Sequence, residues 1–310
     1  MPWHLPVMQA PIGPATTWEL VVAVSAVGGL GTLAASWTEL AELRGQIGRI
    51  VSATANPFCV NLVLAFDQRD RLELLFECGV PVVEFSWGID AALIGRARQA
   101  GLSVLVQVAD EYEAKSAAAA GADVLIAQGV EAGGHVQGRT PLLSLVRKVC
   151  AAVELPIVAA GGIADPVAAR NAIAAGAQAV ACGSAFLAAS EADVNPRYLA
   201  RVLEAEASDT QITGLFDVGW PHAPHRVIRN RTLTDWEQAG CPQPGTRPGE
   251  GEVIASRRGT PIVRYSDAQP TTQTQGDIEA MAMYAGQSVE HVREVASAQS
   301  ITRNIADSLG

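Results

Sequence analysis

Short apolar runs alternate with longer amphipathic, alanine-rich segments along the first two thirds of the chain. Short runs rich in branched aliphatic residues are typical of buried strands, and apolar positions three or four residues apart are typical of helices that cover a sheet. The pattern predicts eight strands, at residues 6–10, 29–33, 59–64, 82–85, 104–107, 124–127, 157–160 and 179–182.

Helices are predicted between these strands, and several of them end in a glycine directly before the next strand, where it can close the helix in a left-handed cap. Repeated β-α units with no mark of a reversal in strand order favour a closed (β/α)8 TIM barrel over an open α/β sheet. The expected helices span residues 17–27, 38–52, 69–78, 91–100, 112–120, 141–153 and 166–175.

The rhythm changes after the eighth strand. Residues 186–207 have a helical pattern, 213–231 are irregular and rich in Trp, Pro and His, 240–259 form a Pro/Gly/Arg-rich loop, 260–265 suit a short strand, and 276–306 are largely helical in pattern. We therefore expect a barrel domain over residues 1–207 and a C-terminal cap over 208–310, packed together as one functional unit.

Composition narrows the class of protein. With 49% apolar and 17% charged residues in 310, the chain can bury a large core. A net charge of −10 without a Lys/Arg cluster argues against nucleic-acid binding. Five cysteines without CxxC spacing favour reduced thiols over disulfides or a metal site. No leader-like N-terminus and no apolar stretch of about 18 residues is found, which predicts a cytoplasmic protein without a membrane anchor; a homo-oligomer stays open.

The most informative stretch is the loop at residues 127–138, AQGVEAGGHVQG, which follows the sixth strand. Gly133 and Gly134 allow close backbone approach to a ligand, and His135 is the only side chain there that titrates near neutral pH. A glycine-rich turn with an incidental surface histidine is the alternative. Glu131 is interpreted as a loop carboxylate that orients the backbone.

In such a barrel the C-terminal ends of the strands share one face, so residues just beyond each strand should converge. Glycine turns that expose backbone N–H groups bind phosphate, and Gly161, Gly162 and Gly183 with the Ser184 hydroxyl have this character after strands seven and eight. Tight barrel turns alone also explain either glycine pair. Uncharged amides that could surround a planar heterocycle, or simply satisfy backbone groups, are Asn61, Gln107 and Gln128.

The chain resembles the nitronate monooxygenase (2-nitropropane dioxygenase) family of FMN-dependent TIM-barrel enzymes. The resemblance rests on segments in family order: residues 9–13 (QAPIG), 28–31 (GGLG), 60–62 (VNL), 127–135 (AQGVEAGGH), 159–165 (AAGGIAD) and 181–187 (ACGSAFL). Residues 285–288 (AGQS) also match.

The resemblance implies roles for individual residues. His135 matches the catalytic histidine, which takes a proton from the carbon beside the nitro group or stabilises the anionic nitronate. The implied FMN-binding positions are Ala10, Pro11, Ile12, Asn61, Gln107, Gln128, Gly133, Gly134, Gly161, Gly162, Cys182, Gly183 and Ser184, the last standing where threonine is common. A departure from the family pattern lies at residues 220–226 (WPHAPHR), which adds His222 and His225, for which a cap-packing or surface role is favoured. Trp87 either walls the substrate pocket or packs in the core.

Three functions follow from these observations. The first is oxidation of a small nitronate or nitroalkane by O2, giving a carbonyl compound and nitrite. The second is an FMN-dependent NAD(P)H:quinone or enoyl-thioester reductase, which the absence of a GxGxxG fingerprint does not exclude, because nicotinamide can stack on flavin without one. The third is a non-enzymatic flavin-binding protein.

Overall fold

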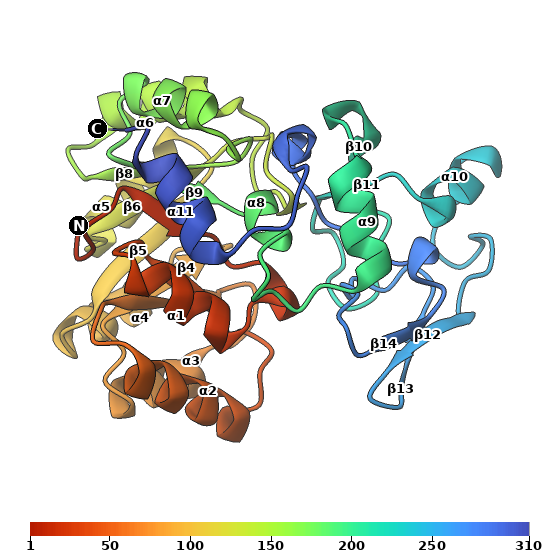
Figure 1. Cartoon of the computed structure of the whole chain (residues 1–310), viewed down its shortest axis with the longest axis horizontal. Coiled ribbons are helices and arrows are strands. Elements are labelled where there is room, and N and C mark those ends of the chain that lie inside the picture. Colours follow the sequence, from red (N-terminus) through yellow and green to blue (C-terminus); the bar gives the residue numbers. More distant parts are fainter. Residues whose placement is uncertain (310) are drawn as a thin grey trace.

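The structure, a computed structural model, describes residues 1–309 as a barrel with a smaller lobe beside it (Figure 1). The barrel sheet is wholly parallel, in the order β1-β9-β8-β6-β5-β4-β3-β2. All eight predicted strands are present, and the predicted TIM barrel is confirmed. The strands are β1 (Val7–Gln9), β2 (Gly31–Ala34), β3 (Phe58–Val63), β4 (Val82–Ser86), β5 (Ser103–Val108), β6 (Val124–Gln128), β8 (Ile157–Ala160) and β9 (Ala179–Cys182).

The barrel closes between its first two strands. The Gln9 N–H donates to the Leu30 carbonyl at 2.9 Å, and the Leu30 N–H donates to the Val7 carbonyl at 3.0 Å. Next to this junction, a Cβ on Gly31 would lie 2.3 Å from the carbonyl oxygen of Val21 in α1 (Trp18–Ala26). The glycines that make β2 a poor strand pattern therefore allow the first helix to approach the sheet closely enough for closure.

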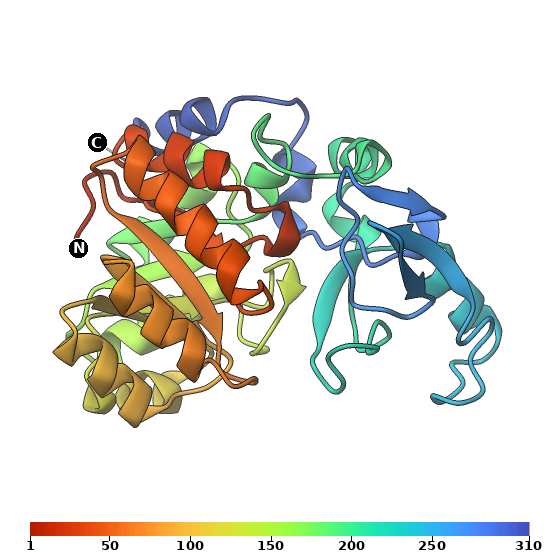
Figure 2. The ribbon, with the colours of Figure 1, turned by 90° about the horizontal axis from the view of Figure 1, so that it is seen from below.

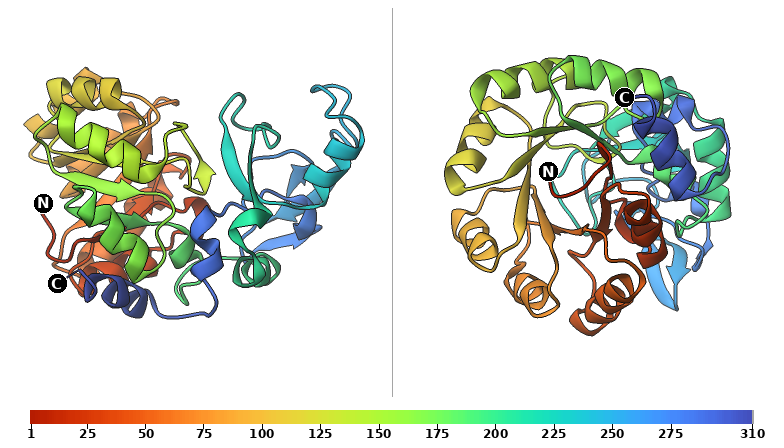
Figure 3. Two further views of the ribbon diagram at one scale, coloured as in Figure 1. Left: turned by 90° about the horizontal axis from the view of Figure 1, so that it is seen from above. Right: turned by 60° about the vertical axis from the view of Figure 1, so that its left-hand side comes forward.

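Helices form a ring around the strands, as the right-hand view of Figure 3 shows. Asp90, Asp110 and Asp165 begin three of them by accepting hydrogen bonds from backbone N–H groups of the first turn. Gly121 ends one with φ 102°, the left-handed cap that the sequence predicts. After α1 the ring continues with α2 (Leu40–Ala53), α3 (Arg69–Glu77), α4 (Ala91–Gln99), α5 (Glu111–Ala120), α6 (Leu142–Ala152) and α7 (Pro166–Ala174), close to the predicted ranges.

Side chains of the strands alternate between the helical layer and the barrel interior. The helical layer packs against one large aliphatic cluster. The interior is filled by a second buried cluster that includes Trp3 together with Met8, Leu30, Cys59, Val82, Leu105, Val124, Ile126, Val158, Ala160, Ala179 and Ala181. The next inward-facing positions toward the C-terminal ends of the strands are more polar. These positions form the floor of the candidate site.

Glu84 is an acidic residue among those inward positions. It lies two residues after Val82 on β4 and is 1% exposed. Burial raises the pKa of its carboxyl to about 8, and the Asn61 amide offsets only part of that shift. Within residues 1–309 its Oε2 atom has no hydrogen-bond partner. The protonated carboxyl therefore predominates at neutral pH, because the charged form would be desolvated.

The second lobe contains two small antiparallel sheets and two helices (Figure 2). One sheet joins β10 (Thr210–Thr213) and β11 (His225–Ile228) to β7 (Gly134–His135), and the other joins β12 (Val253–Arg257), β13 (Thr260–Val263) and β14 (Thr274–Gly276). The helices are α9 (Pro196–Glu204) and α10 (Arg231–Gln238). The predicted strand at 260–265 corresponds to β13, whereas β11 and β12 lie in segments expected to be irregular.

Inside this lobe, Arg247 connects the loop segments. Its guanidinium is almost fully buried and pairs with Asp217 at 2.8 Å and Glu250 at 2.6 Å. It also lies over the Tyr265 ring, 4.2 Å from the centroid. These contacts hold a Pro/Gly/Arg-rich loop in a defined position, because a buried guanidinium needs its partners.

Two helical predictions for the C-terminal third are wrong in extent. Residues 186–207 contain the end of α8 (Ser184–Leu187) and then α9, since Asn195 and Pro196 begin a new helix. Gly276 ends β14, and residues 277–306 contain the 3-10 turns Ile278–Ala280 and Gln287–His291 and the helix α11 (Ala298–Ala306). The segment between is extended because Met283 accepts a hydrogen bond from the Ile228 N–H at 2.8 Å, and this tertiary contact overrides local helix propensity.

The chain then returns to the barrel. α11 packs against α1, β1 and α7, and both chain ends lie on the barrel side of the molecule (Figure 1). In the part of the chain that is described, no helix is long and apolar enough to cross a bilayer.

The five cysteines are free thiols, as predicted. Cys59 and Cys182 are buried, Cys78 and Cys150 are half-buried, and Cys241 is exposed. Cys59 faces the barrel interior and Cys182 faces the helical layer.

Glu84→Gln tests the buried carboxyl. The folded-state pKa is raised, so the stability that the protonated group contributes is present below pH 4.5 and lost as pH rises through about 8. We expect the variant to gain stability over the wild type between these limits, on the order of a few kcal/mol at pH 8. Urea unfolding at pH 5 and pH 8.5 measures this, with exposed Glu204→Gln as the control; a pH-independent difference would contradict the assignment.

Candidate active site at the mouth of the barrel

The loop after β6 leaves the barrel and pairs with the lobe. Its Gly134 and His135 form β7, which lies antiparallel to β11 with His135 opposite His225 and Gly134 opposite Arg226. The Val136 N–H also donates to the Pro224 carbonyl at 2.8 Å. This backbone pairing fixes the predicted catalytic histidine between the two parts of the molecule.

The His135 ring lies among aromatic side chains. Trp220 stacks on it with centroids 4.2 Å apart and ring planes at 26°. His225, Tyr284 and Trp87 lie around it at centroid distances of 5.3, 5.6 and 6.1 Å. Within residues 1–309, the buried Nε2 atom of His135 has no hydrogen-bond partner. It is therefore free to accept a proton or a hydrogen bond from a bound molecule.

Burial sets the charge of both histidines. Desolvation, with a smaller contribution from His225, lowers the pKa of His135 to about 3. The pKa of His225 is also lowered by burial. His225 Nδ1 donates to the Ala223 carbonyl at 2.9 Å and Nε2 accepts from the Phe216 N–H at 3.3 Å. His225 is thus a neutral packing residue with both nitrogens engaged, whereas His135 is neutral with a free nitrogen.

The glycine turns after β8 and β9 lie at the same end of the barrel. Gly161 and Gly162 have φ of 108° and 67°, and a Cβ at Gly162 would contact the Glu131 side chain at 3.0 Å. A Cβ at Gly183 would lie 3.8 Å from the Ile12 side chain and 3.9 Å from that of Ala10. Within residues 1–309, the N–H groups of Gly162 and Gly183 donate no hydrogen bond to the protein. Backbone of this kind suits an anionic phosphate group.

A second glycine junction ties these turns to the lobe. A Cβ at Gly133 would lie 2.3 Å from the backbone nitrogen of Gly286, so the two segments touch without side chains between them. The Gly286 N–H donates to the Ser184 hydroxyl at 2.8 Å, and the Gln287 N–H donates to the Glu131 carbonyl at 3.0 Å. The Glu131 carboxylate accepts from the Leu142 N–H, the backbone-orienting role that the sequence predicts.

The three predicted amides differ in which of their polar atoms remain free to bind a ligand. Gln128 holds the loop, because its Nε2 donates to the His135 carbonyl at 3.2 Å and its Oε1 accepts from the Gln137 N–H at 3.0 Å. Gln107 donates to Gln137 Oε1 at 3.3 Å. Asn61 donates to Ser86 Oγ at 3.2 Å from the barrel interior, beside Glu84. Asn61 and Gln107 thus keep acceptor oxygens for a ligand, while Gln128 positions the backbone of His135.

The turn after β1 completes the rim. Ala10 and Ile12 flank Gly183, with Pro11 between them, and the Ala10 N–H donates to the Cys182 carbonyl at 2.9 Å. Cys182 itself contributes only backbone here: its side chain is buried in the helical layer, and burial raises the pKa of its thiol to about 12. The structure thus brings the predicted residues to one end of the barrel, with the Cys182 thiol facing away from it.

The sequence does not predict most of the groups that surround His135. It places Trp220 only in a segment that departs from the family pattern, favours a cap-packing or surface role for His225, and gives no role to Tyr284. His222, by contrast, is exposed. The sequence indicates Tyr284 only through its position directly before residues 285–286, which match the family. Nothing in the local pattern shows that these residues meet, because the contact is made by chain segments far apart in sequence.

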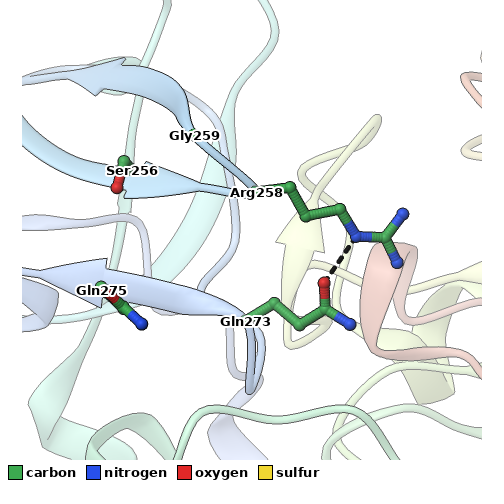
Figure 4. A pocket seen from close by; sticks show the side chains of 5 residues that line it. All are labelled: Ser256, Arg258, Gly259, Gln273 and Gln275. Carbon is green, nitrogen blue, oxygen red and sulfur yellow. Dashed lines mark hydrogen bonds between the residues drawn. The ribbon is translucent and has the colours of Figure 1, made fainter.

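A separate hollow lies on the lobe, at the turn between β12 and β13 and beside β14 (Figure 4). It has a volume of about 320 Å³ and is lined by Ser256, Arg258, Gly259, Gln273 and Gln275. Arg258 Nε donates to Gln273 Oε1 at 2.5 Å. None of its lining residues belongs to the predicted site or supplies a base, so the barrel mouth is the better candidate.

The chain is similar to known proteins over nearly its whole length. The sequence profile of the family described as "Nitronate monooxygenase" matches residues 1–307. A nitronate monooxygenase from Pseudomonas aeruginosa is 29% identical over 98% of this chain and 96% of its own length. The structure of a nitroalkane oxidase from Streptomyces ansochromogenes superposes with a TM-score of 0.79 at 30% identity, covering 99% of this chain and 96% of that one.

A relative of different named activity is more similar in sequence over a shorter region. The (3aS,4S,5R,7aS)-5-hydroxy-7a-methyl-1-oxo-octahydro-1H-indene-4-carboxyl-CoA dehydrogenase of Mycobacterium tuberculosis is 36% identical over 235 residues, which is 75% of this chain. The match spans 65% of that relative's length.

Paired glycine substitutions test the junction between loop and lobe. Gly133→Ala places a Cβ against the backbone of residues 285–286, so we expect a loss of about 2–3 kcal/mol in the free energy of unfolding. Gly134→Ala meets open space, and its φ of 72° makes the expected cost only about 1 kcal/mol. Chemical denaturation of both variants measures the difference, and equal losses would show that the junction is loosely packed.

Proposed function

Because the chain belongs to the nitronate monooxygenase family and is an oxidoreductase, we propose that it uses FMN to oxidise nitronates or nitroalkanes with O2, releasing nitrite. The observation that carries the proposal is the buried, unpartnered Nε2 of His135 at the C-terminal end of the barrel. That end is where TIM-barrel enzymes place their chemistry.

The residues at the rim fit FMN in two respects. The N–H groups of Gly162 and Gly183, which donate to no protein group within residues 1–309, can bind a phosphate, and the Ser184 hydroxyl, which accepts from the Gly286 N–H, still has its own proton to donate. Asn61 and Gln107 provide acceptor oxygens for a planar ring. When bound, FMN supplies the electron acceptor and the reactivity toward O2. We infer that residues 208–310 act with the barrel as one unit, in which the lobe covers this rim.

His135 is the base in this proposal. A neutral imidazole can take the proton from the carbon next to the nitro group, whereas an imidazolium could not. Its low pKa makes it a weak base until negative charge develops beside it, because a nearby anion favours the protonated form. A nitronate that arrives already ionised is instead held by an imidazole that takes up a proton as the anion binds.

A second candidate function is redox chemistry on an acyl thioester. The relative named as a carboxyl-CoA dehydrogenase favours it, at 36% identity. The carbon next to a thioester carbonyl is also acidic, so a free neutral histidine suits this substrate class as well. The two candidates share His135 and the rim. They differ in the compounds that exchange electrons with the flavin, which are a nitronate or nitroalkane and O2 in the first and an acyl thioester in the second.

The first test is turnover. FMN-loaded protein should consume O2 and release nitrite with a nitroalkane, and His135→Ala should keep its flavin while losing about 10²- to 10⁴-fold in kcat/KM. Nitrite and O2 assays measure the rate, and the flavin absorbance measures the bound cofactor. His222→Ala, an exposed histidine on the lobe, is the matched control and should retain full activity.

Anaerobic mixing separates the alternatives. Rapid bleaching of the flavin by NADPH, or by an acyl-CoA with no nitrite release from nitroalkanes, would overturn the first function in favour of the second. Undiminished turnover by His135→Ala would remove the histidine from either mechanism.

The pH dependence follows from the burial of His135. Its pKa of about 3 keeps the free enzyme's imidazole neutral at all higher pH, so kcat/KM for a nitroalkane should stay flat from pH 8 to about pH 5. An unburied histidine would instead give an acid limb near pH 6.5. Initial rates across this range decide the point, with folding checked at each pH, because a depressed histidine pKa also means that stability is lost as pH falls below 6.5.

A further inference from the structure

Four aromatic side chains form a continuous surface next to His135, which we call the aromatic wall: Trp37, Phe66, Trp87 and Trp220. Trp220 connects its members, with ring centroids 4.8 Å from Trp87, 5.2 Å from Phe66 and 5.9 Å from Trp37. Trp37 and Phe66 also meet edge to face at 5.4 Å. Since Trp220 stacks on His135, the wall begins at the proposed base and extends outward from it.

The wall is built from several loops at the same end of the barrel. Trp37 follows β2, Phe66 follows β3 and Trp87 follows β4, while Trp220 comes from the lobe. Trp37 is 55% exposed, although a tryptophan is usually covered. Phe66 and Trp87 are half-buried and Trp220 is buried, so the wall runs from exposed Trp37 to the buried base. An aromatic lining beside a buried polar group is typical of a binding site for an apolar group.

Three arginines that could approach this surface are engaged with other groups. In the described part of the chain, the only guanidinium stacked on an aromatic ring is that of Arg247 on Tyr265, outside the wall. Arg71, on the loop side, donates to the carbonyls of Ala35 and Thr38. Arg226 donates to Thr210 and to the Val130 carbonyl, and it adjoins His225 on a strand where neighbouring side chains face opposite ways.

One acidic group, in contrast, lies next to the wall. The Asp267 carboxylate adjoins Gly219, the residue before Trp220, and its backbone carbonyl accepts from the Tyr284 hydroxyl at 2.9 Å. A carboxylate bound on these rings would have to give up its hydration, which is costly.

We propose that the site selects a carbon acid whose remaining part is apolar, an alkyl or alicyclic group that lies on the aromatic wall, and discriminates against substrates that carry a carboxylate. The proposal rests on the proposed function for the reacting end of the substrate. It adds the chemical class of the remaining part of the substrate.

Binding can be measured separately from turnover. Under anaerobic conditions without reductant, calorimetric titration of FMN-loaded protein at pH 7.5 compares 1-nitrohexane with 3-nitropropionate. We expect 1-nitrohexane to bind at least tenfold more tightly, because burial of one or two methylene groups changes an affinity by about that factor. Equal or tighter binding of 3-nitropropionate, or no binding of either, overturns the proposal.

Two variants test the wall itself. Trp220→Ala should bring the two affinities close together by removing the ring that links the wall to His135. Trp37→Arg, at a position that is 55% exposed, should strengthen 3-nitropropionate binding by two- to fivefold, the size expected of an exposed ion pair. Tyr112→Ala, a 78% exposed aromatic outside the wall, should change neither affinity. Unchanged selectivity in both wall variants contradicts the proposal.

Binding and turnover measured on the same FMN-loaded protein separate the proposed substrate preference from the proposed oxidation. Selective binding of 1-nitrohexane without O2 uptake or nitrite release supports the wall and contradicts the proposed oxidation. Nitrite release that is fastest with 3-nitropropionate, together with its tighter binding, supports the oxidation and overturns the wall.

Discussion

The short antiparallel pairing of β7 with β11 is the interaction on which the rest of the site depends. It joins Gly134 and His135, from the loop after β6, to Arg226 and His225 of the lobe. Without it, the loop would be a glycine-rich excursion at the end of a barrel strand. With it, the imidazole is placed against Trp220 and Tyr284, and the lobe becomes a wall of the barrel mouth.

This pairing also sets the electrostatics. Covered by aromatic rings, His135 loses hydration that an imidazolium would need, so its neutral form is favoured far below the usual range. His225 reaches neutrality differently, with both ring nitrogens bonded to backbone. Two adjacent histidines therefore divide into a free base and a structural residue according to hydrogen bonding alone. Beneath them, Glu84 is neutral for the same reason of burial.

Glycines allow the loop after β6 to lie directly against residues 285–286. Gly133 touches Gly286 backbone to backbone, and Gly286 in turn donates to Ser184 at the start of α8. The loop, the lobe and the β9 rim thus form one connected backbone unit beside the proposed phosphate position. Side chains at these points would separate segments that must touch, which gives the glycine-rich motif a packing role in addition to any ligand.

The sequence by itself determined the barrel. Strand and helix periodicity are local properties, so all eight strands and the helices between them could be predicted from apolar spacing and from helix-ending glycines such as Gly121. Convergence of His135, Gly162 and Gly183 at one rim also followed, because parallel strands of a barrel share their C-terminal face.

Only the tertiary structure decided what surrounds the histidine. Trp220 and His225 lie in a segment without regular periodicity, and Tyr284 lies in one with a helical pattern. Residues 281–284 are nevertheless extended because they pair with β11. Contacts between distant segments depend on how the lobe packs, which no local pattern encodes. The candidate base could therefore be proposed from the sequence, while its protonation state and the apolar surface beside it could not.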